Sequence, residues 1–132
     1  MIVLDTHIWV WWVNGDSALP SAKQQIIAAN EPTGLGVSAI SCWEVAKLVE
    51  KKRLVLALPV HQWIAQALAY PGIRWLPLTP KIAVDSTRLP QPFHNDPADQ
   101  IVVASARDLD CPLATDDQEI LQYAHVKLAW PR

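Results

Sequence analysis

Several carboxylates of this 132-residue chain occupy positions where they could gather at one site. Asp5 directly follows the apolar residues 2–4, which are predicted to form a strand buried on both faces. Asp116 and Asp117 directly follow residues 113–115, another predicted strand. The carboxyl ends of parallel strands meet at one edge of a sheet, where such folds bind ligands. These acids are therefore expected to lie close together.

Two further acids lie on predicted helices. Glu44 has Ile40 four residues before it and Leu48 four residues after it, so its carboxylate lies on a partly apolar helical face. Asp99 stands at the entrance of the predicted helix 101–109, where the positive end of the helix dipole favours an anion. Clustered carboxylates repel one another unless a cation neutralises them, and carboxylate and water ligands suit Mg²⁺ or Mn²⁺.

Each of these acids also has a structural interpretation. Asp5 and Asp96 could be N-caps of the helices that follow them, with Asp99 in the first helical turn. Asp116 or Asp117 could cap the helix predicted after them. Capping does not predict that the acids share one edge of the sheet, because caps occur at either edge. Their common location therefore favours a site.

Other polar side chains near these acids leave alternatives open. Glu44 could form an ion pair with Lys47 on its own helix. His94, two residues before Asp96, could suggest zinc, but a hydrogen bond to nearby backbone is the favoured interpretation, and no CxxC or HExxH spacing occurs. The basic residues toward the end of the predicted helix that carries Glu44 could contact phosphate or simply face solvent: Lys47, Lys51, Lys52 and Arg53.

The elements that must position these side chains alternate along the chain. Alternating strands and helices predict parallel βαβ units and a layered α/β fold. The predicted strands are 2–4, 34–38, 73–78, 113–115 and 126–129, and the predicted helices are 6–13, 20–29, 39–52, 61–70, 80–89, 101–109 and 118–123.

Composition limits the remaining possibilities. With 51% hydrophobic and 18% charged residues, residues 1–132 are expected to form a single domain. A net charge of −2 excludes nucleic-acid binding through bulk positive charge. No apolar run approaches the roughly 18 residues of a membrane span, and the first residues lack the features of a signal peptide, so a cytoplasmic protein is expected.

The uncharged side chains that could be reactive or bind bases are expected to be buried. Cys42 and Cys111 are predicted to be buried thiols rather than a disulfide. Aromatic faces can stack on bases, but packing in the core or at a subunit interface is the favoured interpretation for four tryptophans in apolar helices: Trp9, Trp12, Trp43 and Trp63.

Four segments, taken in order, together resemble PIN-domain proteins of the VapC toxin type. They are VLDTH at 3–7, SAISCWEVA at 38–46, HNDPADQIVVASA at 94–106 and LATDD at 113–117. Each motif alone is weak, but their order and spacing make the resemblance specific, and it covers nearly the whole chain.

The resemblance assigns roles residue by residue. It places Gln100 where relatives often carry Arg, and it leaves Asp116 as an additional carboxylate beside the expected acid. Asp96 and Asp116 remain alternative metal ligands. Thr6 and Thr115 match hydroxyls that orient acids, water or phosphate. The acids that match the metal site of the family are Asp5, Glu44, Asp99 and Asp117.

The resemblance also implies a fold and an activity. The fold is a Rossmann-like three-layer α/β/α sandwich with a mainly parallel sheet. The activity is Mg²⁺- or Mn²⁺-dependent endonucleolytic cleavage of RNA, by a homodimer with a cognate antitoxin as partner. Two alternatives from other classes are an inactive module whose acidic pocket binds a basic partner segment, and a receiver-like phosphorylation module. The receiver needs a mid-chain strand-end Asp and a late Lys after a strand, and neither is evident.

Overall fold

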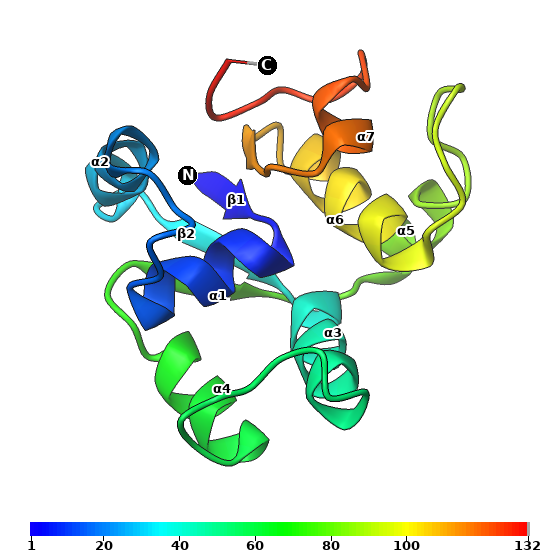
Figure 1. Cartoon of the computed structure of the whole chain (residues 1–132). Coiled ribbons are helices and arrows are strands. Elements are labelled where there is room, and N and C mark those ends of the chain that lie inside the picture. Colours follow the sequence, from blue (N-terminus) through cyan, green and yellow to red (C-terminus); the bar gives the residue numbers. More distant parts are fainter. Residues whose placement is uncertain (132) are drawn as a thin grey trace.

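A parallel sheet forms the centre of the molecule (Figure 1). The computed structural model describes residues 1–131, and their sheet consists of β1 (Ile2–Leu4), β2 (Leu35–Ser38), β3 (Ile73–Leu76) and β4 (Leu113–Ala114). The strands lie in the order β3-β2-β1-β4, and all neighbours are parallel. Val3 in the central strand β1 pairs with Gly36 on one side and with Leu113 on the other. Both faces of β1 are buried, which explains its continuous apolar sequence.

Helices cover both faces of this sheet. Ile2 and Leu4 belong to one apolar core with Trp9, whereas Val3 points to the opposite face and belongs to a second core with Val103. Figure 1 shows α1, α2 and α4 on the first side and α5, α6 and α7 on the second. The predicted three-layer α/β/α sandwich is confirmed. The helices are α1 (Thr6–Asn14), α2 (Ser21–Asn30), α3 (Ala39–Glu50), α4 (Val60–Leu68), α5 (Pro80–Asp85), α6 (Pro97–Asp108) and α7 (Gln118–Leu121).

Several predicted boundaries differ from the structure. The predicted strand 126–129 is reduced to one parallel bridge between Leu113 and Leu128. Strand β3 ends at Leu76, because Pro77 has no N–H to donate to a neighbouring strand. Helix α5 ends at Asp85 rather than at residue 89, and α6 begins at Pro97, where Asp96 caps it and proline favours the first turn.

The tryptophans divide between the core and the surface. Trp9 and Trp63 are buried, with their rings in edge contact at a centroid distance of 5.1 Å, and Trp12 is partly buried against the same core. Trp43 is 54% exposed in this chain, so it does not pack in the core, and its packing at a subunit interface stays a prediction. Helix α3 carries Val45 into the core but turns Trp43 outward.

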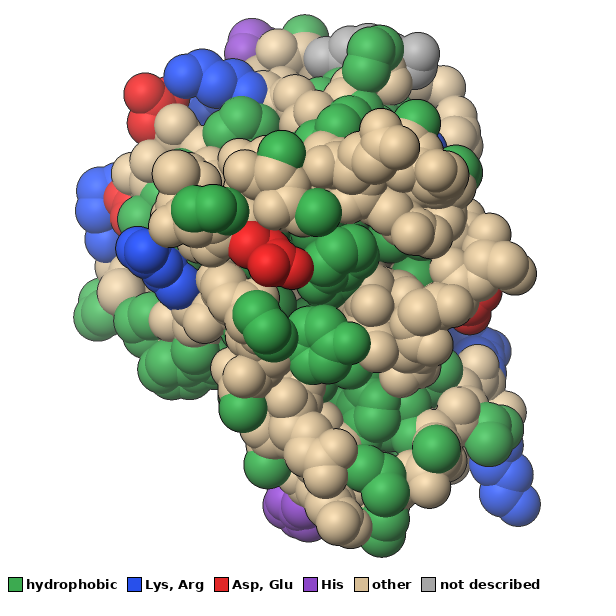
Figure 2. All heavy atoms as spheres, turned by 90° about the vertical axis from the view of Figure 1, so that its left-hand side faces the viewer, with side chains coloured by type: hydrophobic (Ala, Val, Ile, Leu, Met, Phe, Trp, Pro, Cys, Tyr) green, Lys and Arg blue, Asp and Glu red, His purple; other side chains and the backbone are tan. Residues whose placement is uncertain are grey.

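The two cysteines are partly buried rather than enclosed in the core. Cys42 and Cys111 are free, as predicted, but each is only partly buried because one lies beside exposed Trp43 and the other in the turn after α6. No helix within residues 1–131 is long and apolar enough to span a bilayer. Figure 2 shows that hydrophobic side chains gather on the face carrying α2 and α4.

Candidate metal and active site

Asp5 is the acid at the centre of the candidate site. The chain passes directly from β1 into α1, so the Asp5 side chain is fixed at the carboxyl end of the central strand. It is only 3% exposed. Its Oδ1 accepts the Thr6 N–H at 2.8 Å, and its Oδ2 accepts the Thr115 hydroxyl at 2.7 Å. These bonds satisfy a buried carboxylate that would otherwise be costly.

Thr115 joins two parts of the site. Its side chain is fully buried, and the same hydroxyl oxygen that donates to Asp5 accepts the Asp117 N–H at 3.0 Å. Asp117 in turn caps α7, because its Oδ1 accepts the N–H groups of Glu119 and Ile120 at 3.0 and 3.1 Å. The cap fixes the orientation of the Asp117 carboxylate at the end of β4.

Glu44 reaches the same edge from α3. The Thr6 hydroxyl donates to Glu44 Oε1 at 2.5 Å, and Ser41 Oγ lies 2.8 Å from the Thr6 hydroxyl oxygen. Burial raises the pKa of Glu44, the Thr6 hydrogen bond opposes this rise, and the negative charges of nearby aspartates add to it. The alternative ion pair with Lys47 is not formed, because Lys47 instead binds Glu50 at 2.8 Å.

Asp99 has the most strongly perturbed carboxyl group of the site. It lies in the first turn of α6. Burial, together with the charges of Asp5, Asp96, Asp117 and Glu44, raises its pKa to about 8. Burial first, and the four neighbouring negative charges second, thus favour the protonated form of Asp99 when no cation is bound.

Asp96 and Asp116, the less certain metal ligands, have other partners. Asp96 is exposed and caps α6, with its Oδ1 accepting the Asp99 N–H at 3.1 Å. Asp116 Oδ1 accepts from Lys23 Nζ at 2.6 Å, and the Asp116 backbone N–H donates to His7 Nε2 at 3.0 Å. The structure thus directs Asp116 toward α2 and groups Asp117 with Asp99.

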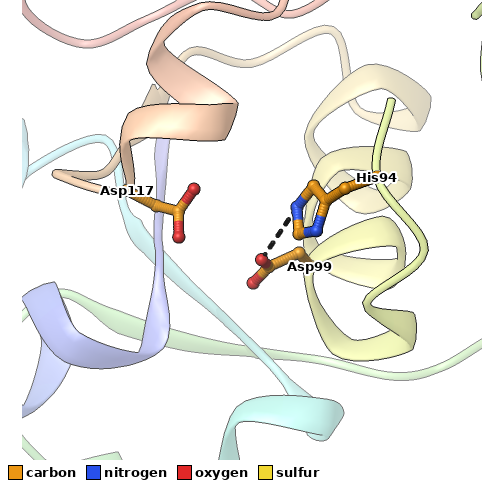
Figure 3. A group of neighbouring side chains, drawn as sticks. All are labelled: His94, Asp99 and Asp117. Carbon is orange, nitrogen blue, oxygen red and sulfur yellow. Dashed lines mark ion pairs between the residues drawn. The ribbon is translucent and has the colours of Figure 1, made fainter. Parts of the chain in front are cut away.

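His94 is placed differently from the prediction of a hydrogen bond to backbone. Its ring lies between Asp99 and Glu119, with Nε2 3.1 Å from Asp99 Oδ2 and Nδ1 2.9 Å from Glu119 Oε2. Figure 3 shows His94 and Asp99 facing the same space as Asp117. One ligand atom from each of these three residues lies within 4.8 Å of the others.

Sequence reasoning missed three contributors to the site. Tertiary packing brings Ser41 to Thr6, His7 to the Asp116 N–H and Glu119 to His94. His7 and Ser41 lie inside the motifs that resemble the family. Their closeness in sequence to Asp5 and Glu44 was the signal that could have found them. Glu119 follows the site acid Asp117 by two residues, but nothing in its spacing indicates a histidine partner 25 positions earlier.

The donor set fits a divalent cation. Within the described residues, no lysine or arginine forms an ion pair with Asp5, Glu44, Asp99 or Asp117, whose charges act on one another, and among these four only Asp99 and Asp117 belong to a group of ligand atoms within 4.8 Å, with His94. Carboxylate oxygens in this number, with unbalanced negative charge, are what a hard divalent ion requires. The arrangement can therefore hold such an ion.

This fold and this edge of acids define the class of the protein. The PIN domain family matches residues 2–126, and the chain belongs to this family. It is 34% identical over 124 residues to "Ribonuclease VapC22" of Mycobacterium tuberculosis, an alignment that covers 94% of this chain and 92% of that protein.

Solved structures share the fold at lower identity. A structure of VapBC2 from Rickettsia felis, bound to a DNA fragment from its promoter, aligns with a TM-score of 0.65 at 16% identity over 97% of each chain. A toxin–antitoxin complex from Klebsiella pneumoniae aligns with a TM-score of 0.64 at 17% identity over 100% of each chain. These similarities place the sandwich among known PIN-like structures.

Proposed function

We propose that this chain is a cytoplasmic, Mg²⁺- or Mn²⁺-dependent endoribonuclease that hydrolyses RNA phosphodiesters as the toxin of a toxin–antitoxin pair. The observation that carries the proposal is the convergence of four carboxylates from separate segments without a lysine or arginine ion-pair partner among residues 1–131. Family membership and the 34% identity to a ribonuclease add support. Membership of the PIN family also disfavours the receiver-like alternative.

The side chains divide into ligands and positioning residues. A bound divalent ion lowers the pKa of an attacking water and offsets the charge of the scissile phosphate. Thr6 holds Glu44, and Thr115 holds both Asp5 and the backbone of Asp117. Glu44 is suited to accept a proton from water because burial raises its pKa. The residues proposed to hold the ion are Asp5, Glu44, Asp99 and Asp117.

A groove beside Glu44 is the proposed path for single-stranded RNA. This cavity of about 450 Å³ lies between α3 and the start of α6, with Glu44 and Asp96 at its acidic end. Apolar side chains line it, and the cations along it are Lys47, Lys51 and Arg53. Cations bind phosphates and exposed aromatic rings stack on bases, so Trp43, which also lines the groove, supplies the second element of recognition.

Removing the Trp43 ring is expected to weaken RNA binding. Loss of one base-stacking contact costs about 1–3 kcal/mol, so the affinity of Trp43→Ala for a labelled single-stranded RNA should fall roughly 5- to 150-fold. Fluorescence anisotropy on an Asp5→Asn background measures binding without cleavage. Tyr70→Ala is the control, because Tyr70 is an aromatic residue that is 39% exposed but does not line the groove. Equal affinities in both variants would remove Trp43 from the RNA path.

The antitoxin partner is proposed on two observations. Hydrophobic side chains gather on the face carrying α2 and α4 (Figure 2). Side chains such as Trp12 and Ile64 are only partly covered by the core beneath them. The acidic site would also attract arginine or lysine from a partner segment.

We further propose a homodimer, for which exposed apolar residues around β3, including Trp75 and Leu78, offer a surface.

The direct test of function is RNA cleavage. Purified protein incubated with total cellular RNA, including tRNA and rRNA, should produce discrete fragments with Mg²⁺ or Mn²⁺ and none with EDTA. Asp5→Asn controls for a contaminating nuclease, because Asp5 is held within the site and its loss should abolish cleavage. Cleavage that survives both controls would count against the proposal. Metal binding without cleavage of any RNA would instead favour the inactive binding module.

A further inference from the structure

The loop that carries His94 is held against the site by several contacts. Gln100 on α6 donates from Nε2 to the His94 carbonyl at 3.0 Å. The Tyr123 hydroxyl donates to the Pro90 carbonyl at 2.6 Å, and the Tyr123 ring packs on Phe93 at a centroid distance of 4.5 Å. The backbone of this loop is therefore positioned from two separate elements, and with it the His94 ring.

The two ring nitrogens of His94 have different surroundings. Nδ1 is in ion-pair contact with Glu119, 2.9 Å from its Oε2. Nε2 is buried and lies 3.1 Å from Asp99 Oδ2, yet it has no hydrogen bond of acceptable geometry. When Nδ1 carries the proton for Glu119, the lone pair of Nε2 faces the space next to the Asp99 carboxylate (Figure 3). Such a lone pair beside a carboxylate is stabilised by a cation between them.

This arrangement has the form of a metal-binding histidine. Histidines that bind metal ions characteristically donate their other N–H to a carboxylate, which fixes the ring orientation and raises the basicity of the coordinating nitrogen. Glu119 occupies that outer position here. Ligand atoms of His94, Asp99 and Asp117 lie within 4.8 Å of one another, close to the separation of about 4 Å across one ion.

We propose that His94 Nε2 is a nitrogen ligand to the divalent ion held by Asp99 and Asp117, so that this site prefers Mn²⁺ to Mg²⁺. The inference rests on one part of the proposed function, namely that a divalent ion binds at Asp99 and Asp117. Imidazole suits transition-metal ions, whereas Mg²⁺ prefers oxygen ligands and retains water. Glu119 is then a positioning residue that acts through His94.

Metal binding to the full-length protein tests the proposal without RNA. Calorimetry with Mn²⁺ and with Mg²⁺ should show His94→Asn binding Mn²⁺ at least about tenfold more weakly, with a much smaller change for Mg²⁺. Pulsed electron paramagnetic resonance should detect nitrogen coupling to Mn²⁺ in the wild type and lose it in His94→Asn. Glu119→Ala should weaken Mn²⁺ binding, and Glu119→Gln should restore most of it because the amide oxygen still accepts from Nδ1.

Two histidine variants serve as controls. His61→Asn changes an exposed histidine on α4 and should bind Mn²⁺ as the wild type does. His7→Asn tests the other histidine near the acids, since His7 Nδ1 lies 3.7 Å from Asp5 Oδ2. An unchanged Mn²⁺-to-Mg²⁺ affinity ratio in His94→Asn, or nitrogen coupling that disappears only in His7→Asn, overturns the proposal. A wild-type protein that cleaves no RNA, while His94→Asn shows the expected change in this ratio, would count against the nuclease assignment alone.

Discussion

The Asp99→Asn protein is expected to cleave RNA at least about a thousandfold more slowly than the wild type while being more stable when no metal is present. Losing a charged ligand removes several kcal/mol of the stabilisation that a bound ion gives to the reacting phosphate, and each 1.36 kcal/mol corresponds to a factor of ten. The same substitution removes a carboxylate whose pKa is raised to about 8 by burial and by neighbouring acids. Activity and stability should therefore change in opposite directions.

The pH dependence of stability identifies the cause. In the folded, metal-free protein Asp99 keeps its proton up to about pH 8, whereas the unfolded chain releases it near the ordinary value of 3.8. Between these values the unfolded state binds fewer protons, so the free energy of unfolding falls as pH rises. Solvent screening at this partly exposed site limits the contribution to about 1–3 kcal/mol.

Thermal unfolding followed by circular dichroism measures this effect. In EDTA, the melting temperature of the wild type should fall from pH 5 to pH 9, and most of this fall should be absent in Asp99→Asn. Saturating Mn²⁺ should also stabilise the wild type at pH 9, because a ligand that binds only the folded state stabilises it. Asp16→Asn is a matched control on an exposed aspartate. An identical fall in Asp99→Asn would show that other groups carry the pH dependence.

Replacing Thr115 with valine is expected to destabilise the protein by about 2–4 kcal/mol and to slow RNA cleavage about 10- to 100-fold. Valine preserves the shape of threonine but removes the hydroxyl that donates to Asp5 and accepts from the Asp117 N–H. Both groups lose a partner at a fully buried position, and unsatisfied buried groups are costly. For a domain of this size the melting temperature should fall by roughly 7–14 °C.

Two further threonine variants separate this effect from a general loss of packing. Thr115→Ser keeps the hydroxyl and should recover most of the cleavage rate despite losing a methyl group. Thr87→Val removes an exposed hydroxyl that bonds only to the nearby Val84 carbonyl, so it should leave cleavage unchanged. A Thr115→Val protein with wild-type stability and cleavage would show that the Asp5 orientation does not depend on this hydroxyl.

The parts of the fold that sequence could predict are those fixed by local patterns. A short apolar run followed by Asp5 predicted a buried strand with an acid at its carboxyl end, and the strand and the N-cap are both present. Pro97, directly after Asp96, signalled a helix start. Helix α6 does begin at Pro97, four residues before the predicted start at residue 101. Local chemistry decides these features, so a single sequence contains them.

Contacts between distant residues explain what could not be predicted. Lys23 lies 93 positions before Asp116 and pairs with it, which leaves Asp117 as the acid grouped with Asp99. No spacing rule in the sequence indicates which of the adjacent residues Asp116 and Asp117 pairs with so distant a lysine. The exposure of Trp43 depends on which helix packs beside α3, and its apolar neighbours in sequence suggested packing in the core or at a subunit interface.

The Thr115–Asp5 hydrogen bond also has a consequence for the order of synthesis. It joins residues that are 110 positions apart, and β1 lies between strands formed early and late in translation. A growing chain on the ribosome exposes Asp5 long before Asp117 exists, so an unfinished polypeptide carries only separate acids and cannot assemble the site. For an enzyme of the proposed kind, nascent chains would be harmless to surrounding RNA until Asp117 has been added. For such an enzyme, this delay would give a protein inhibitor made beforehand the opportunity to meet each new molecule as its activity first appears.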